Sequence, residues 1–374
     1  MTIQTNDTNK LKNKIPISTI ILVLIALFIS VAVRLILAWQ TSDIDLYHYK
    51  DQYISIFSPD PALYGYYATL LLQGLPHTTD VNMIEYFIYY IVKYGPFSLD
   101  FIMYFGPAVF ASFICIPVIL ILQMYTNSKI ILFFAGVTAA IGYGFYSRTY
   151  LGYFDTDVFN VFLPMMIVYS MILVIRKLDY RYAIFGVFFN ILYLSWYHSS
   201  EPIVYSLNGF FILFSLVFFL KKSELYKVSI LFGLSIIKII FLQKVILLAI
   251  FFIGFYFLKL NYKYFLGIFI CAVIAILYKI DLSQFAFHLD RYLFKSENIQ
   301  NLNYKFLAPM QLVSEAQGAT FNDFVKLISG NIFIFSLSII GYFFFVIRHK
   351  ELLLSLPLLA IGIVSLEAGV RFHI

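Results

Sequence analysis

Long runs of apolar residues, separated by short polar segments, repeat along almost the whole chain. Each run has about 17 to 25 residues, the length of helix that crosses the hydrocarbon core of a bilayer. The pattern predicts membrane-spanning helices at 16–39, 99–124, 129–146, 158–175, 181–197, 202–220, 226–242, 245–259, 263–279, 331–348 and 351–368. Because only Gln243 and Lys244 separate the seventh and eighth of these runs, we expect a tight turn at those two residues.

Two of the connections between the runs are long, at 40–98 and 280–330, and the others are short. Short connections keep consecutive helices next to each other, so the predicted fold is an all-α polytopic membrane bundle with about 11 spans. Loops as long as the other two are typical of lids and binding elements. The first of them contains an amphipathic stretch from Met83 to Tyr94.

The composition agrees with this class: 61% of the residues are hydrophobic, 12% are charged, and the mean hydropathy is +0.87. Lys and Arg gather on the side of the bundle that holds the N-terminus, whereas most Asp and Glu fall on the other side. The positive-inside rule then places the tail 1–15 in the cytoplasm and both long loops outside. The net charge of +6 is therefore a signal of topology, not of nucleic-acid binding.

Two further features bear on processing and redox chemistry. The first apolar run is too long for a signal-peptide core and no small-residue cleavage site follows it, so we expect a retained helix. Cys115 and Cys271 both lie inside apolar runs, which favours core packing over a disulfide or a metal site.

The polar segment with the clearest chemistry is YLGYFDTD at 150–157, where a loop gives way to an apolar run. Asp155 and Asp157 are costly at the edge of a membrane helix unless a cation or a function retains them. Carboxylates one residue apart can hold a divalent metal, and that metal can hold a phosphate. The simpler alternative is that Asp157 caps the following helix and favours its positive N-terminal end.

Other polar residues on the outer side also admit two interpretations. Asp60 lies between two prolines, which is ordinary turn chemistry. Arg148 is an interfacial anchor or a partner for an anionic phosphate, and the same choice applies to Arg371 beyond the last span. Trp196 and Tyr197 belong to an aromatic belt at the interface or cradle a lipid headgroup.

Taken together and in order, these segments resemble the bacterial single-subunit oligosaccharyltransferases of the PglB type. The motifs that carry the resemblance are SRT at 147–149, GYFDTD at 152–157, WY and SS within 196–200, ISG at 328–330 and AGVRF at 368–372. Glu315 falls at the glutamate of the family's TIxE motif, and Asp60 at its first-loop aspartate. The order, spacing and sidedness agree across most of residues 16–374.

The resemblance implies a GT-C type glycosyltransferase that acts in protein N-glycosylation. Such an enzyme moves an oligosaccharide from a polyprenyl-pyrophosphate carrier to the side-chain amide of asparagine in Asn-x-Ser/Thr sequons. The implied location is the bacterial inner membrane, with a cytoplasmic N-terminus and a periplasmic active site. The implied partners are the lipid-linked oligosaccharide, an acceptor polypeptide and membrane lipids.

The resemblance also implies roles for individual residues. Asp60, Asp155, Asp157 and Glu315 would surround a Mn²⁺ or Mg²⁺ ion, with Arg148 among the catalytic residues. Asp60 and Glu315 would also hydrogen-bond the carboxamide of the acceptor asparagine. The lipid pyrophosphate would be contacted by Arg371, Tyr197 and Trp196, and Tyr292 would lie near the donor.

These residue types suit the chemistry. An amide nitrogen is a poor nucleophile because its lone pair is delocalised, and carboxylates that bind both of its N–H groups favour a twisted, more reactive amide. On the donor side, the negative charge that develops on a pyrophosphate leaving group is stabilised by a metal ion and an arginine.

The chain also departs from the family pattern. The TIxE motif is LVSE at 312–315, without a hydroxyl at its first position, and Leu327 stands where some bacterial members carry an arginine, with Lys326 beside it. The family continues with a C-terminal periplasmic domain that bears a WWD motif, and the two tryptophans here are Trp39 and Trp196, so we expect this sequence to be an N-terminal fragment of a longer enzyme or a truncated product. We therefore expect residues 16–374 to form the transmembrane catalytic domain and, alone, to be inactive on a sequon.

Two alternatives stay open from the sequence. Another GT-C lipid-phosphosugar glycosyltransferase, with an O-linked or lipid acceptor, shares the first-loop aspartate and the outer active site. A transporter for an anionic lipid is the alternative from a different class, and it predicts charged or broken helices in the middle of the membrane. Within the predicted spans lie Arg34 and Lys238, while the acidic residues gather at one face.

Overall fold

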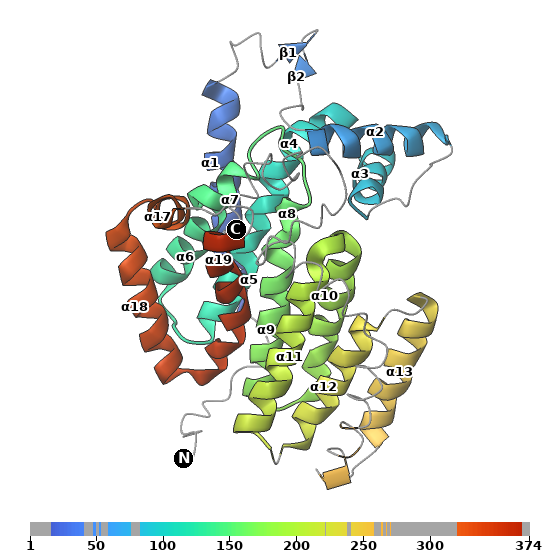
Figure 1. Ribbon diagram of the computed structural model, residues 1–374. Helices are drawn as coiled ribbons and strands as arrows, with labels where there is room; N and C mark the ends of the chain where they lie inside the picture. Colours follow the sequence, from blue (N-terminus) through green and yellow to red (C-terminus); the bar gives the residue numbers. More distant parts are fainter. Residues whose placement is uncertain are drawn as a thin grey trace, which may run out of the picture.

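A computed structural model describes residues 16–40, 48–49, 52–53, 59–75, 83–220, 222–237, 241–257, 263–264, 267, 270 and 320–368. The predictions for Glu315, Tyr292, Arg371, Cys271 and Lys238 lie outside these residues, as does most of the span predicted at 263–279. Nearly all of the described chain is helical, and the long helices run side by side in one bundle (Figure 1).

The helices of the N-terminal half are α1 (Ile17–Gln40), α2 (Pro59–Gln73), α3 (Met83–Tyr94), α4 (Leu99–Ala111), α5 (Cys115–Gln123), α6 (Lys129–Ile141), α7 (Tyr143–Ser147), α8 (Asp157–Asn160) and α9 (Phe162–Lys177). They are followed by α10 (Ala183–Trp196), α11 (Glu201–Phe218), α12 (Ser223–Ile236), α13 (Phe241–Phe257), α17 (Phe321–Ser329), α18 (Ile332–Arg348) and α19 (Leu356–Ala368). Short 3₁₀ helices occur at Ser112–Ile114, Tyr180–Tyr182, His198–Ser200 and Lys350–Ser355. A small antiparallel pair joins β1 (His48–Tyr49) to β2 (Gln52–Tyr53).

Within the described residues, five helical stretches are long and apolar enough to cross a membrane: Ile17–Gln40, Leu99–Gln123, Lys129–Ser147, Asp157–Lys177 and Glu201–Phe218. All five coincide with predicted spans. Helices α17 and α18 meet at a bend of 75° and add a sixth candidate if they form one span. The total of about 11 spans stays a prediction.

Two local expectations are wrong. Helix α12 ends at Ile236 and α13 begins at Phe241, so the turn expected at Gln243 and Lys244 lies inside a helix. Glutamine and lysine are good helix formers, and neither breaks a helix by itself. Helix α2 was not expected, because two prolines flank Asp60; both lie in the first turn, where proline is tolerated. The amphipathic stretch Met83–Tyr94 is confirmed as α3.

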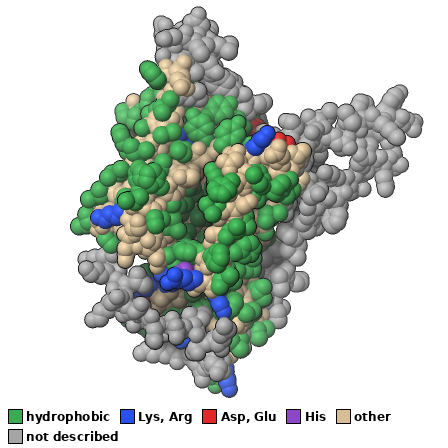
Figure 2. Space-filling view, turned by 90° about the vertical axis from the view of Figure 1, so that its left-hand side faces the viewer, with side chains coloured by type: hydrophobic (Ala, Val, Ile, Leu, Met, Phe, Trp, Pro, Cys, Tyr) green, Lys and Arg blue, Asp and Glu red, His purple; other side chains and the backbone are tan. Residues whose placement is uncertain are grey.

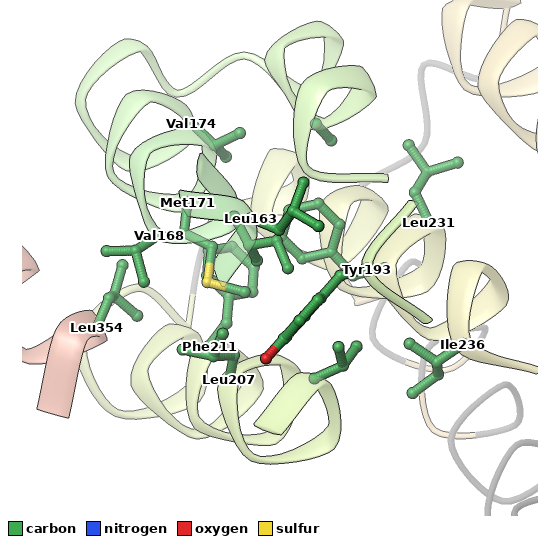
Figure 3. Close-up of a cluster of buried hydrophobic side chains, with 14 of the residues drawn as sticks. Leu163, Val168, Met171, Val174, Tyr193, Leu207, Phe211, Leu231, Ile236 and Leu354 are labelled. Atoms are coloured by element: carbon green, nitrogen blue, oxygen red, sulfur yellow. The ribbon is translucent and has the colours of Figure 1, made fainter. Parts of the chain in front are cut away.

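The main hydrophobic core lies where α9 packs against α10, and α10 packs in turn against α12. Figure 3 shows Met171 and Leu163 of α9 with Tyr193 of α10 and Phe211 of α11 around one buried cluster. Helix α18, in contrast, has no buried residue. On the side where α17 and α18 lie, hydrophobic side chains cover most of the described surface, as expected for contact with lipid (Figure 2).

Candidate active site

The site forms at the upper end of the bundle in Figure 1, where α4 packs against α8 on one side and against α2 and α3 on the other. Between α7 and α8 the chain makes an irregular turn that contains the two predicted carboxylates. Gly152 has φ +78°, a conformation that favours glycine, and its N–H donates to Tyr104 O of α4 at 2.9 Å. Phe154 is fully buried against Gly106 of α4, where an added Cβ would approach the ring to 2.5 Å. The turn is therefore fixed against α4.

Trp196 fixes the other end of this turn. Its Nε1 donates to Thr156 O at 2.8 Å, and its ring packs edge-on against Phe159 and Phe87 at centroid distances of 4.9 and 5.6 Å. Only 3% of Trp196 is exposed. The belt position facing lipid is therefore wrong: the indole supports the segment that carries the carboxylates. The contact of Trp196 with the lipid pyrophosphate stays a prediction.

Asp157 forms an ion pair with Arg148. The Arg148 Nε lies 2.6 Å from Asp157 Oδ2, and Asn160 Nδ2 donates to Asp157 Oδ1 at 2.9 Å. Asp157 is the first residue of α8 and the cap position belongs to Thr156, whose side chain makes no capping bond. Asp157 is therefore not the cap residue, but it lies in the first turn of α8, at the positive end of the helix, as the simpler alternative expected. Arg148 has a carboxylate partner that neither the anchor nor the phosphate interpretation included.

Asp155 lies beside this pair, in an environment that disfavours its charged form. It is 5% exposed, and its Oδ1 accepts hydrogen bonds from Thr156 N at 2.5 Å and Thr156 Oγ1 at 3.2 Å. Burial, followed by the nearby charges of Asp157 and Asp60, raises the pKa of Asp155 to about 7. Near neutral pH this carboxyl group is therefore poised between its protonated and ionised forms.

Tyr64 is a site residue that the sequence reasoning missed. Burial and the charges of Asp155, Asp60 and Tyr197, in that order, raise the pKa of its hydroxyl well above the usual value, so α2 brings Tyr64 to the carboxylates. Tyr64 follows Asp60 by four residues, the spacing that puts two side chains on one face of a helix. The prediction of a helix over α2 would have revealed it.

The predicted metal site is only partly inside the described residues. Among them, no three acidic, histidine or cysteine side chains gather closely enough to hold an ion. The donor chemistry nevertheless fits Mg²⁺ or Mn²⁺, because carboxylate oxygens are hard ligands. The pKa of Asp155 is raised first by burial and then by the charge of Asp157, and a cation would offset both effects. The set of Asp60, Asp155, Asp157 and Glu315 stays a prediction.

Helix α17 brings the end of the second long connection toward the site. Its N-cap residue Thr320 accepts a hydrogen bond from Asp323 N at 3.2 Å, and the helix packs against α7, which ends just before Arg148. Glu315, Tyr292 and Arg371 lie outside the described residues, so their predicted places at the site are untested.

The fold and the site define a class: an all-helical membrane protein with a buried, arginine-paired acidic site at one end of its bundle. The family model described as "Oligosaccharyl transferase STT3, N-terminal" matches residues 65–374. The chain belongs to this family, which confirms the resemblance inferred from the motifs.

Curated relatives agree. Two undecaprenyl-diphosphooligosaccharide–protein glycotransferases of Campylobacter jejuni, from serotype O:2 and strain RM1221, are each 28% identical over 363 residues. Each match covers 94% of this chain and 50% of the relative, so the chain spans about half the length of these relatives.

Solved structures share the fold. The apo oligosaccharyltransferase of Archaeoglobus fulgidus matches with a TM-score of 0.63 and 14% identity, over 95% of this chain and 48% of that one. The AglB oligosaccharyltransferase of the same organism, in complex with an inhibitory peptide and a dolichol-phosphate, matches with a TM-score of 0.58 and 17% identity, again over 95% and 48%.

Proposed function

We propose that this chain forms the membrane-embedded catalytic part of an enzyme that transfers an oligosaccharide from a polyprenyl-pyrophosphate carrier to asparagine. The observation that carries the proposal is the buried Asp155–Asp157 pair, held by Arg148 at one end of an STT3-family bundle. The names of the Campylobacter relatives support the donor and the reaction. The inhibitory peptide and dolichol-phosphate bound to the archaeal relative support a peptide acceptor and a lipid-phosphate donor.

The residues divide the work as follows. Arg148 holds and orients Asp157 through their ion pair. Asp155 supplies a second carboxylate, whose charged form is disfavoured by burial. A bound Mn²⁺ or Mg²⁺ ion would supply Lewis-acid stabilisation of charge on the pyrophosphate. Asp60 and Glu315 would bind the N–H groups of the acceptor amide. Arg371 and Tyr197 would bind the lipid pyrophosphate.

Glu315 precedes Thr320, where the described chain resumes, by five residues, and five residues span at most about 17 Å. Helix α17, which follows Thr320, packs against α7, the helix that ends just before Arg148. This contact supports a place for Glu315 near the carboxylates.

The same geometry supports an orientation in the membrane. Helix α9 starts beside the acidic site and ends with Arg176 and Lys177, about 24 Å away at 1.5 Å per residue over 16 residues. The acidic end would then face the periplasm of a bacterial inner membrane, and the basic end and the N-terminus the cytoplasm. The sequon Asn-x-Ser/Thr is the acceptor expected from the family resemblance.

The test uses the full-length protein, a lipid-linked oligosaccharide and a fluorescent Asn-x-Thr peptide whose glycosylation shifts its gel mobility. We expect a shift with Mn²⁺, none with a chelator, and none in the Asp60→Ala/Glu315→Ala double variant. Asp100→Ala is the matched control, because Asp100 is an exposed carboxylate in the first turn of α4. A folded enzyme that shifts no peptide with any lipid-linked donor would refute the proposal, and sugar on Ser/Thr or on lipid would identify a sister GT-C transferase.

A further inference from the structure

Arg34 is a fully buried cation near the C-terminal end of the membrane-spanning helix α1. Among the described residues no carboxylate pairs with it. Its Nη1 donates to Thr149 O at 2.6 Å and to Thr149 Oγ1 at 2.9 Å, and its Nη2 donates to Ala140 O at 2.5 Å. A charged side chain inside a membrane bundle is rare and expensive, so its retention calls for a specific role.

The carbonyl groups that Arg34 binds lie at a break in the helices. Helix α6 ends at Ile141, and Gly142 has ψ 132°, so Ala140 O lies among the last carbonyls of α6, which have no helical donor. A cation there also interacts favourably with the negative end of the helix dipole. The guanidinium lies 5.4 and 5.2 Å from the rings of Phe145 and Tyr146 in α7. Arg34 thus joins α1 to both sides of the break.

The bond to Thr149 connects this anchor to the site. Thr149 directly follows Arg148, the partner of Asp157, and its own hydroxyl donates to Phe145 O at 2.6 Å. A guanidinium that holds the backbone at Thr149 therefore determines where the Arg148 side chain starts. A shift of this backbone would move Arg148 relative to Asp157, since their contact of 2.6 Å allows little displacement.

We infer that Arg34 is a positioning residue of the active site: from α1 it holds Thr149 and so sets the Arg148–Asp157 pair. The effect on catalysis rests on the proposed function, whereas the effect of Arg34 on the structure of the segment does not depend on that function. Arginine suits the role because its two terminal nitrogens reach two carbonyls at once, whereas lysine has a single nitrogen. Arg34 Nε is buried without a partner, so the three bonds of the terminal nitrogens are what this residue offers.

The experiment compares Arg34→Gln, Arg34→Lys and Thr149→Val with the wild type in full-length protein. Ser30→Ala is the matched control, because Ser30 is buried on the same helix and its hydrogen-bond partners, Ala26 O of α1 and Cys115 Sγ of α5, lie outside 143–157. Hydrogen exchange of peptides that cover 143–157 is measured first. We expect exchange there to rise about tenfold in Arg34→Gln, as the loss of one or two buried hydrogen bonds predicts. Exchange in α11 should not change.

The second readout is the steady-state kinetics of peptide glycosylation. Displacement of Arg148 from its 2.6 Å contact with Asp157 in Arg34→Gln should reduce kcat more than it raises KM. Arg34→Lys and Thr149→Val should fall between the wild type and Arg34→Gln, and Ser30→Ala should match the wild type.

Unchanged exchange over 143–157 together with an unchanged kcat in folded Arg34→Gln would overturn the inference. If Arg34→Gln does not fold, Arg34→Lys and Thr149→Val decide the question by the same two measurements. If the wild type transfers no sugar, the proposed function fails, and hydrogen exchange alone still decides whether Arg34 positions the segment.

Discussion

Replacing Asp155 by asparagine is expected to make the protein more stable at alkaline pH, although it removes a carboxylate of the site. Asp155 is almost completely buried, and burial together with Asp157 raises its pKa from 3.8 to about 7. Asparagine has nearly the same shape, keeps an oxygen that accepts from Thr156 N, and is neutral at every pH. The variant therefore lacks the destabilisation that ionisation of Asp155 causes.

The sign and size follow from proton linkage. Between pH 4 and pH 7 the folded state holds a proton on Asp155 that the unfolded state has released, so the free energy of unfolding falls as pH rises. The slope is about 1.4 kcal/mol per pH unit, which over the interval from 3.8 to about 7 amounts to about 4 kcal/mol. Asp155→Asn should therefore match the wild type near pH 4 and exceed its stability by up to about 4 kcal/mol at pH 8.

The assay is thermal unfolding of both proteins in one detergent at pH 4.5, 6 and 8, without divalent cations. The quantity of interest is the difference between the two, because other titrating groups cancel in it. Asp157→Asn is the contrasting control: it takes the carboxylate partner from a nearly buried Arg148 and should destabilise by about 3 kcal/mol. A difference that does not grow with pH, or a less stable Asp155→Asn at pH 8, would refute the reasoning.

Four further changes have definite expected outcomes. Mn²⁺ or Mg²⁺ should raise the melting temperature of the wild type at pH 8 more than that of the asparagine variant, and a chelator should reverse this. Gly106→Ala should destabilise by about 1–3 kcal/mol in thermal unfolding, since its Cβ would lie 2.5 Å from a buried phenylalanine ring. Trp196→Phe should cost about 1–3 kcal/mol and speed hydrogen exchange of 150–157, because a buried carbonyl loses its donor. Asn190→Ala should lower the free energy of unfolding by about 0.5–2 kcal/mol. The double variant Asn190→Ala/Asn208→Ala, which also removes the reciprocal amide partner, should lower it by less than Asn190→Ala does.

The membrane helices were predictable because the length of an apolar run reports directly on the thickness of a bilayer. The stretch Leu99–Gln123 illustrates this: it contains a 3₁₀ segment and two prolines, Pro107 and Pro117, yet its apolar length decides the outcome. The prediction failed where a helix ends because of the backbone conformation of one residue and not because of its residue type. Ile237 adopts an extended conformation that ends α12, and nothing in its side chain distinguishes it from its helical neighbours.

The sequence predicted which residue types form the site, but not which of these residues contact each other. The motif containing Asp155 and Asp157 identified the carboxylates, but the ion pair with Arg148 depends on a turn that brings together side chains nine residues apart. The role of Arg34 was harder still to predict, because two of its three acceptors are backbone carbonyls, which every sequence contains. The belt position predicted for Trp196 was wrong for a related reason: its role depends on the direction of its indole N–H, which the sequence does not give.

The burial of Asp155 links the stability of the fold to what the site can bind. Above pH 7 the ionised group lies in a place that opposes its charge, and the individual bonds that hold the turn, each worth about 1 kcal/mol, are too weak to offset about 4 kcal/mol. The packed bundle must therefore carry this destabilisation. A cation that binds the ionised carboxylate relieves the repulsion and displaces a proton below pH 7, so the same burial that weakens the fold favours cation binding and makes it depend on pH. A carboxyl group whose pKa lies close to 7, as that of Asp155 does, is suited to exchange its proton for a metal ion at physiological pH.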